Sequence, residues 1–185
     1  MATVAIAGDL SETSRMLLAI LVVISTSKGD IKLDLDQKKA PVTVANFLKY
    51  VNDKHYDGTV FHRVIKGFMI QGGGLDPSLH EKGAAYPPIK NEHSNGLKNV
   101  TGAVAMARTN DPDSATCQFF IDTKDNKFLD QGAGYAVFGK VVKGMDVVRK
   151  IEAVKTEAKP SGEGAVMKDV PAETIVIKSI RVAKK

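Results

Sequence analysis

The sequence predicts a mainly β fold, a closed antiparallel barrel whose ends are capped by two α-helices. Seven or eight short apolar segments have the composition of strands. Two further segments have the apolar spacing of amphipathic helices, and most of the strands lie between them in the chain. Short connections favour antiparallel pairing, and closing the sheet would remove its edges and bury the apolar faces of both helices.

Alternation and turn residues locate the strands. The segment "IKLDLD" (31–36) alternates strictly, and the turn at Lys28-Gly29-Asp30 pairs it with the apolar segment that ends at Ile24. Near Lys178–Ser179 the last strand changes its apolar phase, which fits either a β-bulge or a strand buried on both faces. The other expected strands are two within 59–71, joined around Lys66-Gly67, and those at 102–107, 117–123, 135–142 and from Glu173 onward.

Two segments have helical spacing. The first begins at Pro41, a residue favoured in a first turn, and its apolar positions from Val44 to Val51 recur at helical intervals. The second spans about Met145 to Thr156, and the "KPSGEG" that follows is expected to be a loop. Residues 72–100 are rich in Gly, Pro, Asn and charge, which predicts a long excursion of the kind that is functional or mobile.

We divide the chain into an N-terminal extension or leader remnant at 1–19 and one domain at 20–185. The apolar run "MLLAILVVI" (16–24) is too short to span a membrane, which requires about 20 apolar residues. It fits either a leader core or a buried first strand, and its β-branched end followed by a turn favours the strand. We therefore expect a cytoplasmic protein, with the periplasm as the alternative if this segment acts as a leader.

Composition and spacing exclude several kinds of chemistry. The net charge is +5, but the basic residues are mixed with acidic ones and form no basic-aromatic stripe, which argues against specific nucleic-acid binding. The histidine spacing fits no metal motif, and the Gly72-Gly73-Gly74 run fits a tight turn or a close backbone approach rather than a phosphate loop. Cys117 opens an apolar strand without a cationic neighbour, so we expect an inert, buried thiol. No metal or other cofactor is expected.

Three polar side chains stand inside apolar strands. Arg63 is expected to share its face with Phe61 and Ile65, while Gln71 and Gln118 each share a face with an apolar side chain. Taken singly, the arginine fits a surface ion pair and the glutamines fit hydrogen bonds to buried backbone groups. Taken together, they predict a concave apolar patch with directed donors, which is typical of a ligand site.

Several long motifs carry a family resemblance. The stretch "FHRVIKGFMIQGG" (61–73) resembles the signature of the cyclophilin peptidyl-prolyl isomerases, and "APVTVANFLKYV" resembles their first helix. The segments "CQFFI", "FLD" and "YAVFGKVVKGMDVV" follow in the family's order, so the likeness runs from about Ser25 to the C-terminus. "PIKNE" and Tyr135 resemble bacterial members. The resemblance implies a closed eight-stranded barrel with two capping helices that catalyses cis/trans isomerisation of Xaa–Pro bonds.

The implied reaction needs no nucleophile, metal or cofactor, because no covalent bond forms or breaks. Rotation about an amide interrupts its resonance and has a barrier of about 18–20 kcal/mol. In the twisted state the prolyl nitrogen gains a lone pair, so a donor aimed at this nitrogen stabilises only that state and lowers the barrier. The resemblance makes Arg63 this donor, and a guanidinium suits the role because it stays charged at any working pH.

The resemblance also assigns the remaining site residues. The catalytic group is Arg63, Gln71, Phe68 and Phe120. The substrate-binding group is His62, Met69, Ala107, Arg108, Thr109, Gln118, Phe128, Leu129 and Tyr135. The residues of the proline pocket are Phe68, Met69, Phe120 and Leu129, and the two glutamines hold substrate carbonyls and orient the arginine. The backbone at Ala107 and Arg108 pairs with the extended peptide, and Thr109 faces a neighbouring specificity pocket. His62 fits direct catalysis and a structural or solvent-facing histidine equally well.

Two positions depart from the animal members of the family, which commonly carry Trp where Phe128 stands and His where Tyr135 stands. Phenylalanine keeps the apolar area but lacks the indole N–H donor, so weak cyclosporin binding is expected beside intact isomerase activity. We expect this protein to be a monomer. Its expected partners are proline-containing peptides and unfolded or folding proteins. The competing hypothesis is a proline-peptide binding or chaperone module whose turnover is incidental.

Overall fold

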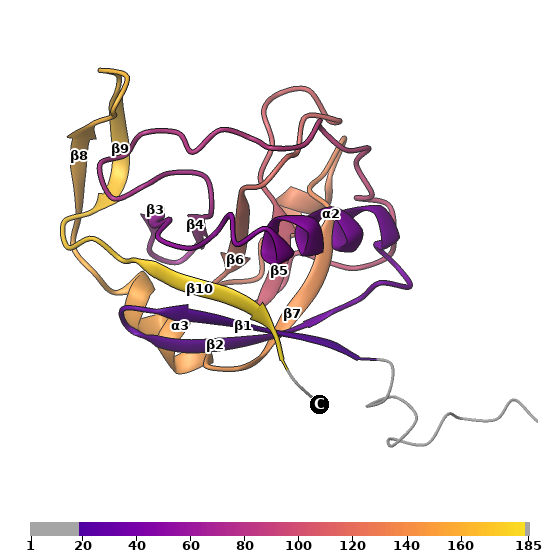
Figure 1. Cartoon of the computed structure of the whole chain (residues 1–185). Coiled ribbons are helices and arrows are strands. Elements are labelled where there is room, and N and C mark those ends of the chain that lie inside the picture. Colours follow the sequence, from indigo (N-terminus) through magenta and orange to yellow (C-terminus); the bar gives the residue numbers. More distant parts are fainter. Residues whose placement is uncertain (1–18, 184–185) are drawn as a thin grey trace, which may run out of the picture.

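Eight strands of the computed structural model, which describes residues 19–183, form one curled antiparallel sheet (Figure 1). The strands run in the order β10-β1-β2-β7-β5-β6-β4-β3. Their bounds are β1 Ile20–Thr26, β2 Gly29–Leu35, β3 Phe61–Ile65, β4 Met69–Gly72, β5 Ala103–Met106, β6 Phe119–Asp122, β7 Val137–Lys143 and β10 Ile177–Val182. The predicted first strand is confirmed as β1, while the predictions for residues 1–18 lie outside the described residues.

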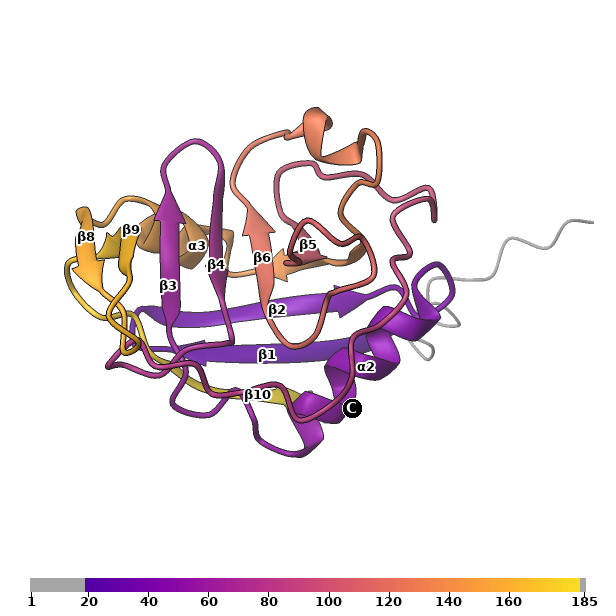
Figure 2. The ribbon, with the colours of Figure 1, turned by 90° about the horizontal axis from the view of Figure 1, so that it is seen from above.

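The prediction of a closed barrel is wrong, because β3 and β10 are the two edges of the sheet and do not pair along their length. The segments that precede these strands meet instead: Val60 and Val176 form an isolated bridge, and the Phe61 N–H donates to the Ile175 carbonyl at 3.0 Å. Beyond this bridge the neighbour of β3 is β9 (Val166–Pro171), which pairs with β8 (Thr156–Pro160) (Figure 2). The sheet is therefore a curled half-barrel.

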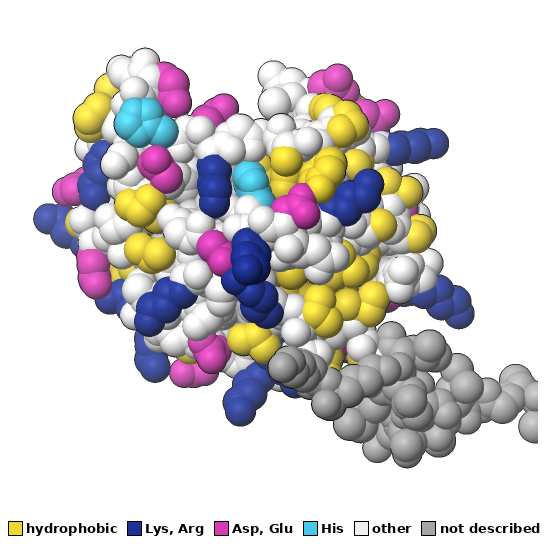
Figure 3. All heavy atoms as spheres, viewed as in Figure 1, with side chains coloured by type: hydrophobic (Ala, Val, Ile, Leu, Met, Phe, Trp, Pro, Cys, Tyr) yellow, Lys and Arg dark blue, Asp and Glu magenta, His cyan; other side chains and the backbone are white. Residues whose placement is uncertain are grey.

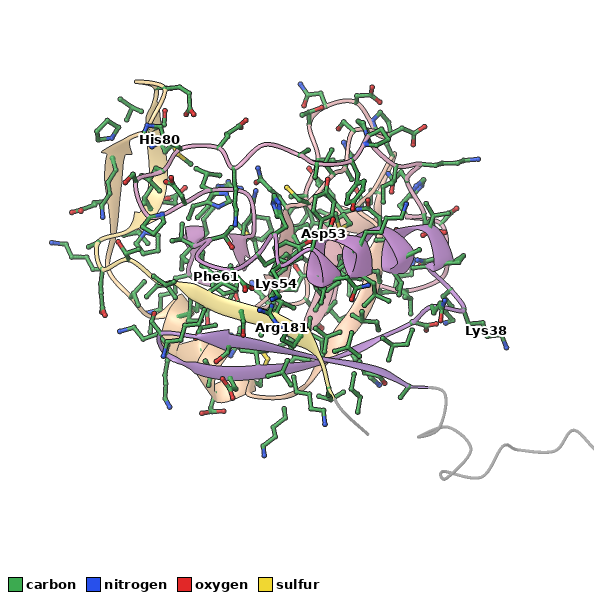
Figure 4. All side chains as sticks on the ribbon, viewed as in Figure 1. Lys38, Asp53, Lys54, Phe61, His80 and Arg181 are labelled. Carbon is green, nitrogen blue, oxygen red and sulfur yellow. The ribbon has the colours of Figure 1, made fainter. Side chains whose placement is uncertain are left out.

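The β8–β9 hairpin replaces a predicted helix end and loop. Helix α3 (Met145–Glu152) ends four residues before the expected Thr156, where β8 begins. No residue of β8 is buried, and β9 buries only its last two residues, so neither strand has an apolar periodicity that the sequence could reveal. The hairpin is held by the long excursion: His80 lies beside it (Figure 4), and the Gly162 N–H donates to the Leu79 carbonyl at 3.0 Å.

The two helices cover opposite ends of the curled sheet (Figures 1 and 2). Helix α2 (Pro41–Asn52) begins at Pro41 as predicted, and its buried face joins that of α3 in the inner core. The largest fully buried aromatic side chains of this core are Phe47, Tyr50, Tyr56, Phe61, Phe119 and Phe138. Glu92 of the long excursion caps α2, because its carboxylate accepts hydrogen bonds from the backbone N–H groups of Val42 and Thr43 at 3.1 and 2.8 Å.

Among the register shifts of the sheet, two β-bulges bear on the sequence predictions. The first lies in β10, where Ser179 and Ile177 pair with consecutive residues of β1 and Lys178 is skipped, as one of the two interpretations predicted. The second lies in β3 at His62, since Phe61 pairs with Gly72 and Arg63 with Gln71. This second bulge turns Phe61 into the inner core, so the expectation that Phe61 and Arg63 share a face is wrong.

Charged side chains of both signs are interspersed on the face shown in Figure 3. Arg181 and Asp57 illustrate the mixture, because they form a two-fold ion pair with N–O distances of 2.7 and 2.5 Å. Within residues 19–183 the longest helices are short of the length and apolarity that crossing a membrane requires.

Candidate active site

A single row of side chains crosses the outer face of the sheet. Arg63 of β3 lies opposite Gln71 of β4, and Gln71 lies opposite Phe120 of β6. The row continues through Ala105 of β5 to Val137 of β7. Because directly opposite residues have Cβ atoms about 4.5–5.5 Å apart on one face, the row brings a guanidinium and an amide next to an apolar surface.

The apolar part of this face is an outer cluster, separate from the inner core. Its buried members are Met69, Ala103, Ala105, Phe120, Leu129 and Val137, and Ile65, Phe68, Leu97, Ala107 and Tyr135 pack against them. The short 3-10 helix η1 (Lys127–Asp130) supplies Leu129, whose carbonyl accepts the Tyr135 N–H at 3.0 Å. The four residues predicted for the proline pocket therefore lie together in the structure.

Aromatic rings border the outer cluster on two sides. The Phe68 and Phe128 rings stack with their centroids 5.6 Å apart, and Phe128 is 59% exposed. On the other side the Tyr135 ring meets Phe120 edge to face at 5.7 Å. Phe128 and Tyr135, the two departures noted in the sequence, thus lie at the border of the same pocket.

Two glutamines are joined beside this pocket. The Gln71 Nε2 donates to the Gln118 Oε1 at 3.0 Å. The Gln118 side chain lies over Gly74, because a Cβ added to Gly74 would be 2.4 Å from the Gln118 Cγ. The close-approach interpretation of the glycine run is therefore confirmed at Gly74, while Gly73 has the left-handed φ of +91° that suits a tight turn.

The Arg108 side chain is fixed on the Tyr135 side of the pocket, a feature that sequence reasoning missed. Its Nε donates to the Gly134 carbonyl at 3.0 Å, and its guanidinium carbon lies 4.4 Å from the Tyr135 ring centroid. The neighbouring Thr109 donates to the Ser114 hydroxyl at 2.8 Å, and the Ala107 N–H donates to the Gln118 carbonyl at 3.0 Å. The predicted peptide-pairing segment is thus ordered by contacts to both flanks of the site.

His62 lies apart from the row because the bulge turns it away. It is 3% exposed and lines a small, partly open pocket of about 30 Å³ with Leu79 and Val170, so the solvent-facing alternative is wrong. Desolvation lowers the pKa of His62 to about 4, and the charge of Arg63 acts in the same direction. Its buried neutral ring has the surroundings of a structural histidine.

Metal and thiol chemistry find no support in residues 19–183. No group of three or more His, Cys, Asp or Glu side chains in this range could hold a metal ion. Cys117 is buried as predicted, and desolvation raises the pKa of its thiol.

A larger hollow lies elsewhere, between α2 and residues 86–89. Its volume is about 420 Å³, and its lining is mostly apolar, including Val42, Pro87 and Ile89. The amide of Asn46 in this lining is already bonded to the Thr116 carbonyl at 2.7 Å. We therefore place the candidate site at the outer cluster, where directed polar groups and an apolar surface occur together.

The fold and the site define a β-sheet protein whose outer face joins an apolar cluster to fixed hydrogen-bonding side chains. The family described as cyclophilin type peptidyl-prolyl cis-trans isomerase/CLD matches residues 21–182. The chain belongs to this family of isomerases, as the sequence motifs predicted.

Individual relatives agree with the family match. The chain is 53% identical over 167 residues to peptidyl-prolyl cis-trans isomerase A of Dickeya dadantii. This alignment covers 89% of this chain and 85% of the relative. It is 50% identical over 170 residues to peptidyl-prolyl cis-trans isomerase B of Escherichia coli, covering 89% of this chain and all of that protein. A crystal structure of a cyclophilin type isomerase from Cryptosporidium parvum superposes with a TM-score of 0.73 at 26% identity, covering 90% and 99% of the two chains.

Proposed function

We propose that this protein binds Xaa–Pro segments at the outer cluster and accelerates rotation about the prolyl amide, with Arg63 stabilising the twisted state. The observation that carries the proposal is the row in which Arg63, Gln71 and Phe120 are directly opposite one another on three adjacent strands. The family match supports the activity. A Cryptosporidium parvum relative of 27% identity was crystallised in the presence of the dipeptide Ala-Pro, which supports the substrate class.

In the proposed mechanism the proline ring enters the outer cluster and rests on Phe120, between Phe68 and Leu129. Gln71 and Gln118, fixed by their mutual hydrogen bond, hold the substrate carbonyl and orient the guanidinium. As the amide twists, the prolyl nitrogen gains a lone pair that accepts a hydrogen bond from Arg63. This bond is absent in the planar ground state, so it lowers the barrier without tightening substrate binding.

The test is NMR exchange spectroscopy on an Ala–Pro peptide with the wild type, Arg63→Ala and Arg63→Lys. We expect Arg63→Ala to lower kcat about 100-fold while peptide affinity changes only a few-fold, as for loss of one donor to a transition state. Arg63→Lys should recover little, because an ammonium lacks the planar fork of donors. Unchanged exchange in Arg63→Ala would refute the donor role. A wild type that binds the peptide without accelerating exchange would favour the binding module.

We also propose a role in protein folding. Proline isomerisation takes tens of seconds without catalysis, which is slow enough to limit refolding. The wild type should accelerate refolding of a substrate protein whose slow phase is proline-limited, and Arg63→Ala should not. Acceleration that persists in Arg63→Ala would instead indicate chaperone binding.

Cyclosporin is proposed to bind weakly, because Phe128 offers stacking area but no N–H donor. Inhibition is therefore expected only at micromolar or higher cyclosporin, and nanomolar inhibition would contradict the proposal. Adding an indole N–H with Phe128→Trp should tighten inhibition by about tenfold, the value of one hydrogen bond.

A further inference from the structure

A buried polar network lies behind the outer cluster, and Asn126 is its centre. Asn126 is 3% exposed and immediately precedes η1. Its side-chain Nδ2 donates to the Phe68 carbonyl at 2.9 Å and to the Asp122 Oδ1 at 2.6 Å. Its backbone N–H donates to the Asn99 carbonyl, and its own carbonyl accepts the Leu129 N–H, both at 2.8 Å. One residue thus connects four segments of the chain.

Two of these segments carry Phe68 and Leu129, and we call them the walls of the proposed proline site. Phe68 follows the turn between β3 and β4, whereas Leu129 belongs to η1, and both pack into the outer cluster. The Phe68 carbonyl also accepts the Thr123 N–H at 3.0 Å, so this wall is held by both a backbone and a side-chain donor. Because Asn126 bonds to both walls, its position sets how far apart they lie.

The network continues to the third wall through Asn99. The Asn99 backbone N–H and Nδ2 donate to the Asp130 Oδ1 at 3.0 and 2.8 Å, and the same Nδ2 lies 3.4 Å from the Tyr135 carbonyl. Asp130 ends η1, and Tyr135 borders the pocket beside Phe120. Asn99 and Asn126, which make these bonds, are both buried.

Asp122 determines which way the Asn126 amide faces. It is fully buried, and its backbone pairs with Met69 of the outer cluster. Since its Oδ1 accepts one hydrogen of the Asn126 amide, the second hydrogen of that amide is free to meet the Phe68 carbonyl. If the Asn126 amide were turned by 180°, its own carbonyl oxygen would face the Asp122 Oδ1 and the Phe68 carbonyl oxygen. Both of these buried acceptors would then lack a donor.

We infer that Asn126 is a positioning residue for the isomerase reaction, which holds Phe68 and Leu129 at the separation that grips a proline ring while Asp122 orients its amide. The inference rests on the proposed function and adds to it a residue that touches no substrate. The walls contact the ring in both the planar and the twisted state. Loosening them therefore weakens ground-state and transition-state binding together, which raises KM and leaves kcat nearly unchanged.

The test measures KM and kcat separately with an Ala–Pro peptide. Asn126→Ala removes both side-chain bonds, and Asn126→Asp keeps the shape but has no N–H for the Phe68 carbonyl. We expect both to raise KM about tenfold with kcat within about twofold of the wild type. Asp122→Ala should raise KM similarly, and Asp122→Asn should raise it less. Arg63→Ala should show the opposite pattern, in which kcat falls and peptide affinity changes only a few-fold.

The control is Thr59→Ala, which removes a buried side-chain bond of 2.7 Å to the Tyr56 carbonyl outside the network. Its KM should equal that of the wild type. Unchanged KM in folded Asn126→Asp, or an equal rise in Thr59→Ala, would overturn the inference. A wild type without isomerase activity would overturn the proposed function, and then the peptide Kd of the same variants would still test the positioning of the pocket walls.

Discussion

Gln71 and Gln118 are joined side chain to side chain, with 3.0 Å between the Gln71 Nε2 and the Gln118 Oε1, and this bond exists because Gly74 has no side chain. Gln71 is opposite Arg63, so the same bond holds the neighbour of the proposed catalytic guanidinium. The space above Gly74 thus determines how Gln118 meets Gln71, the residue opposite Arg63.

Replacing Gly74 with alanine should lower activity with little loss of stability. The added Cβ would lie 2.4–2.6 Å from atoms of the Gln118 side chain, which is flexible and can move aside. The Gln71–Gln118 bond would then be lost, and we expect kcat/KM to fall about tenfold, as for one hydrogen bond of a positioned group. Isomerase kinetics together with urea unfolding would measure both effects.

A double-mutant cycle provides the control for Gly74→Ala. In a Gln118→Ala background the Cγ that the new Cβ would meet is absent, so Gly74→Ala should add little further loss. If the two substitutions instead lowered activity additively, Gly74 would act through something other than Gln118.

Asp122 should make the protein less stable as the pH rises. Desolvation raises the pKa of Asp122 to about 7, and Asp130 and Asp125 add to the rise while the bond from Asn126 opposes it. The folded protein therefore binds this proton more tightly than the unfolded chain does. Its contribution to stability is full below the unfolded pKa of 3.8 and is lost as the pH rises toward 7.

Asp122→Asn removes this titration. The free energy of unfolding of the variant minus that of the wild type should increase by roughly 2–4 kcal/mol between about pH 4 and pH 8. Urea unfolding at several pH values would measure it. A difference that stays constant over this range would show that Asp122 titrates alike in the folded and unfolded states.

Glu152 should stabilise the turn that precedes Phe68. Its Oε1 accepts the Gly67 N–H at 2.7 Å, and its Oε2 accepts from Arg149 at 2.8 Å. Glu152→Ala removes both bonds, and because Gly67 is exposed its freed N–H can bond to water, so we expect a loss of about 1 kcal/mol of unfolding free energy. Lys150→Ala, which breaks only an exposed pair with Asp146 in the same helix, is the control and should change stability little.

Much of the fold was predictable because its signals are local. Pro41 marks the start of α2, and the phase change after Ile177 marks the bulge in β10. The β8–β9 hairpin was missed because β8 has no buried residue and β9 buries only Val170 and Pro171 at its end, so apolar periodicity is absent. The prediction of a closed barrel was wrong because the edge pairing of β3 depends on where β9 packs. This is a long-range contact that composition does not encode.

The residues of the candidate site were predictable as a set, although not in their supporting contacts. The motifs place Phe68, Met69 and Phe120 correctly in one cluster. The bulge at His62 could not be read from the sequence, since one extra residue in β3 reverses the facing of Phe61 and depends on pairing with β4. The sequence analysis did not single out Asn126, because only the tertiary structure brings its amide to the Phe68 carbonyl.

His62 should make the protein less stable as the pH falls. Desolvation lowers its pKa from 6.5 to about 4 in the folded protein, so the unfolded chain binds this proton more tightly. Its contribution to stability is present above pH 6.5 and is lost as the pH falls through 6.5 toward 4, by up to roughly 3 kcal/mol. His62→Gln should remove this loss, which urea unfolding along a pH series would measure. His80→Gln is the control, because the His80 side chain is 56% exposed and its imidazole stays largely in water. A wild type and a His62→Gln variant that lose stability in parallel below pH 6.5 would show that His62 does not carry the acid sensitivity.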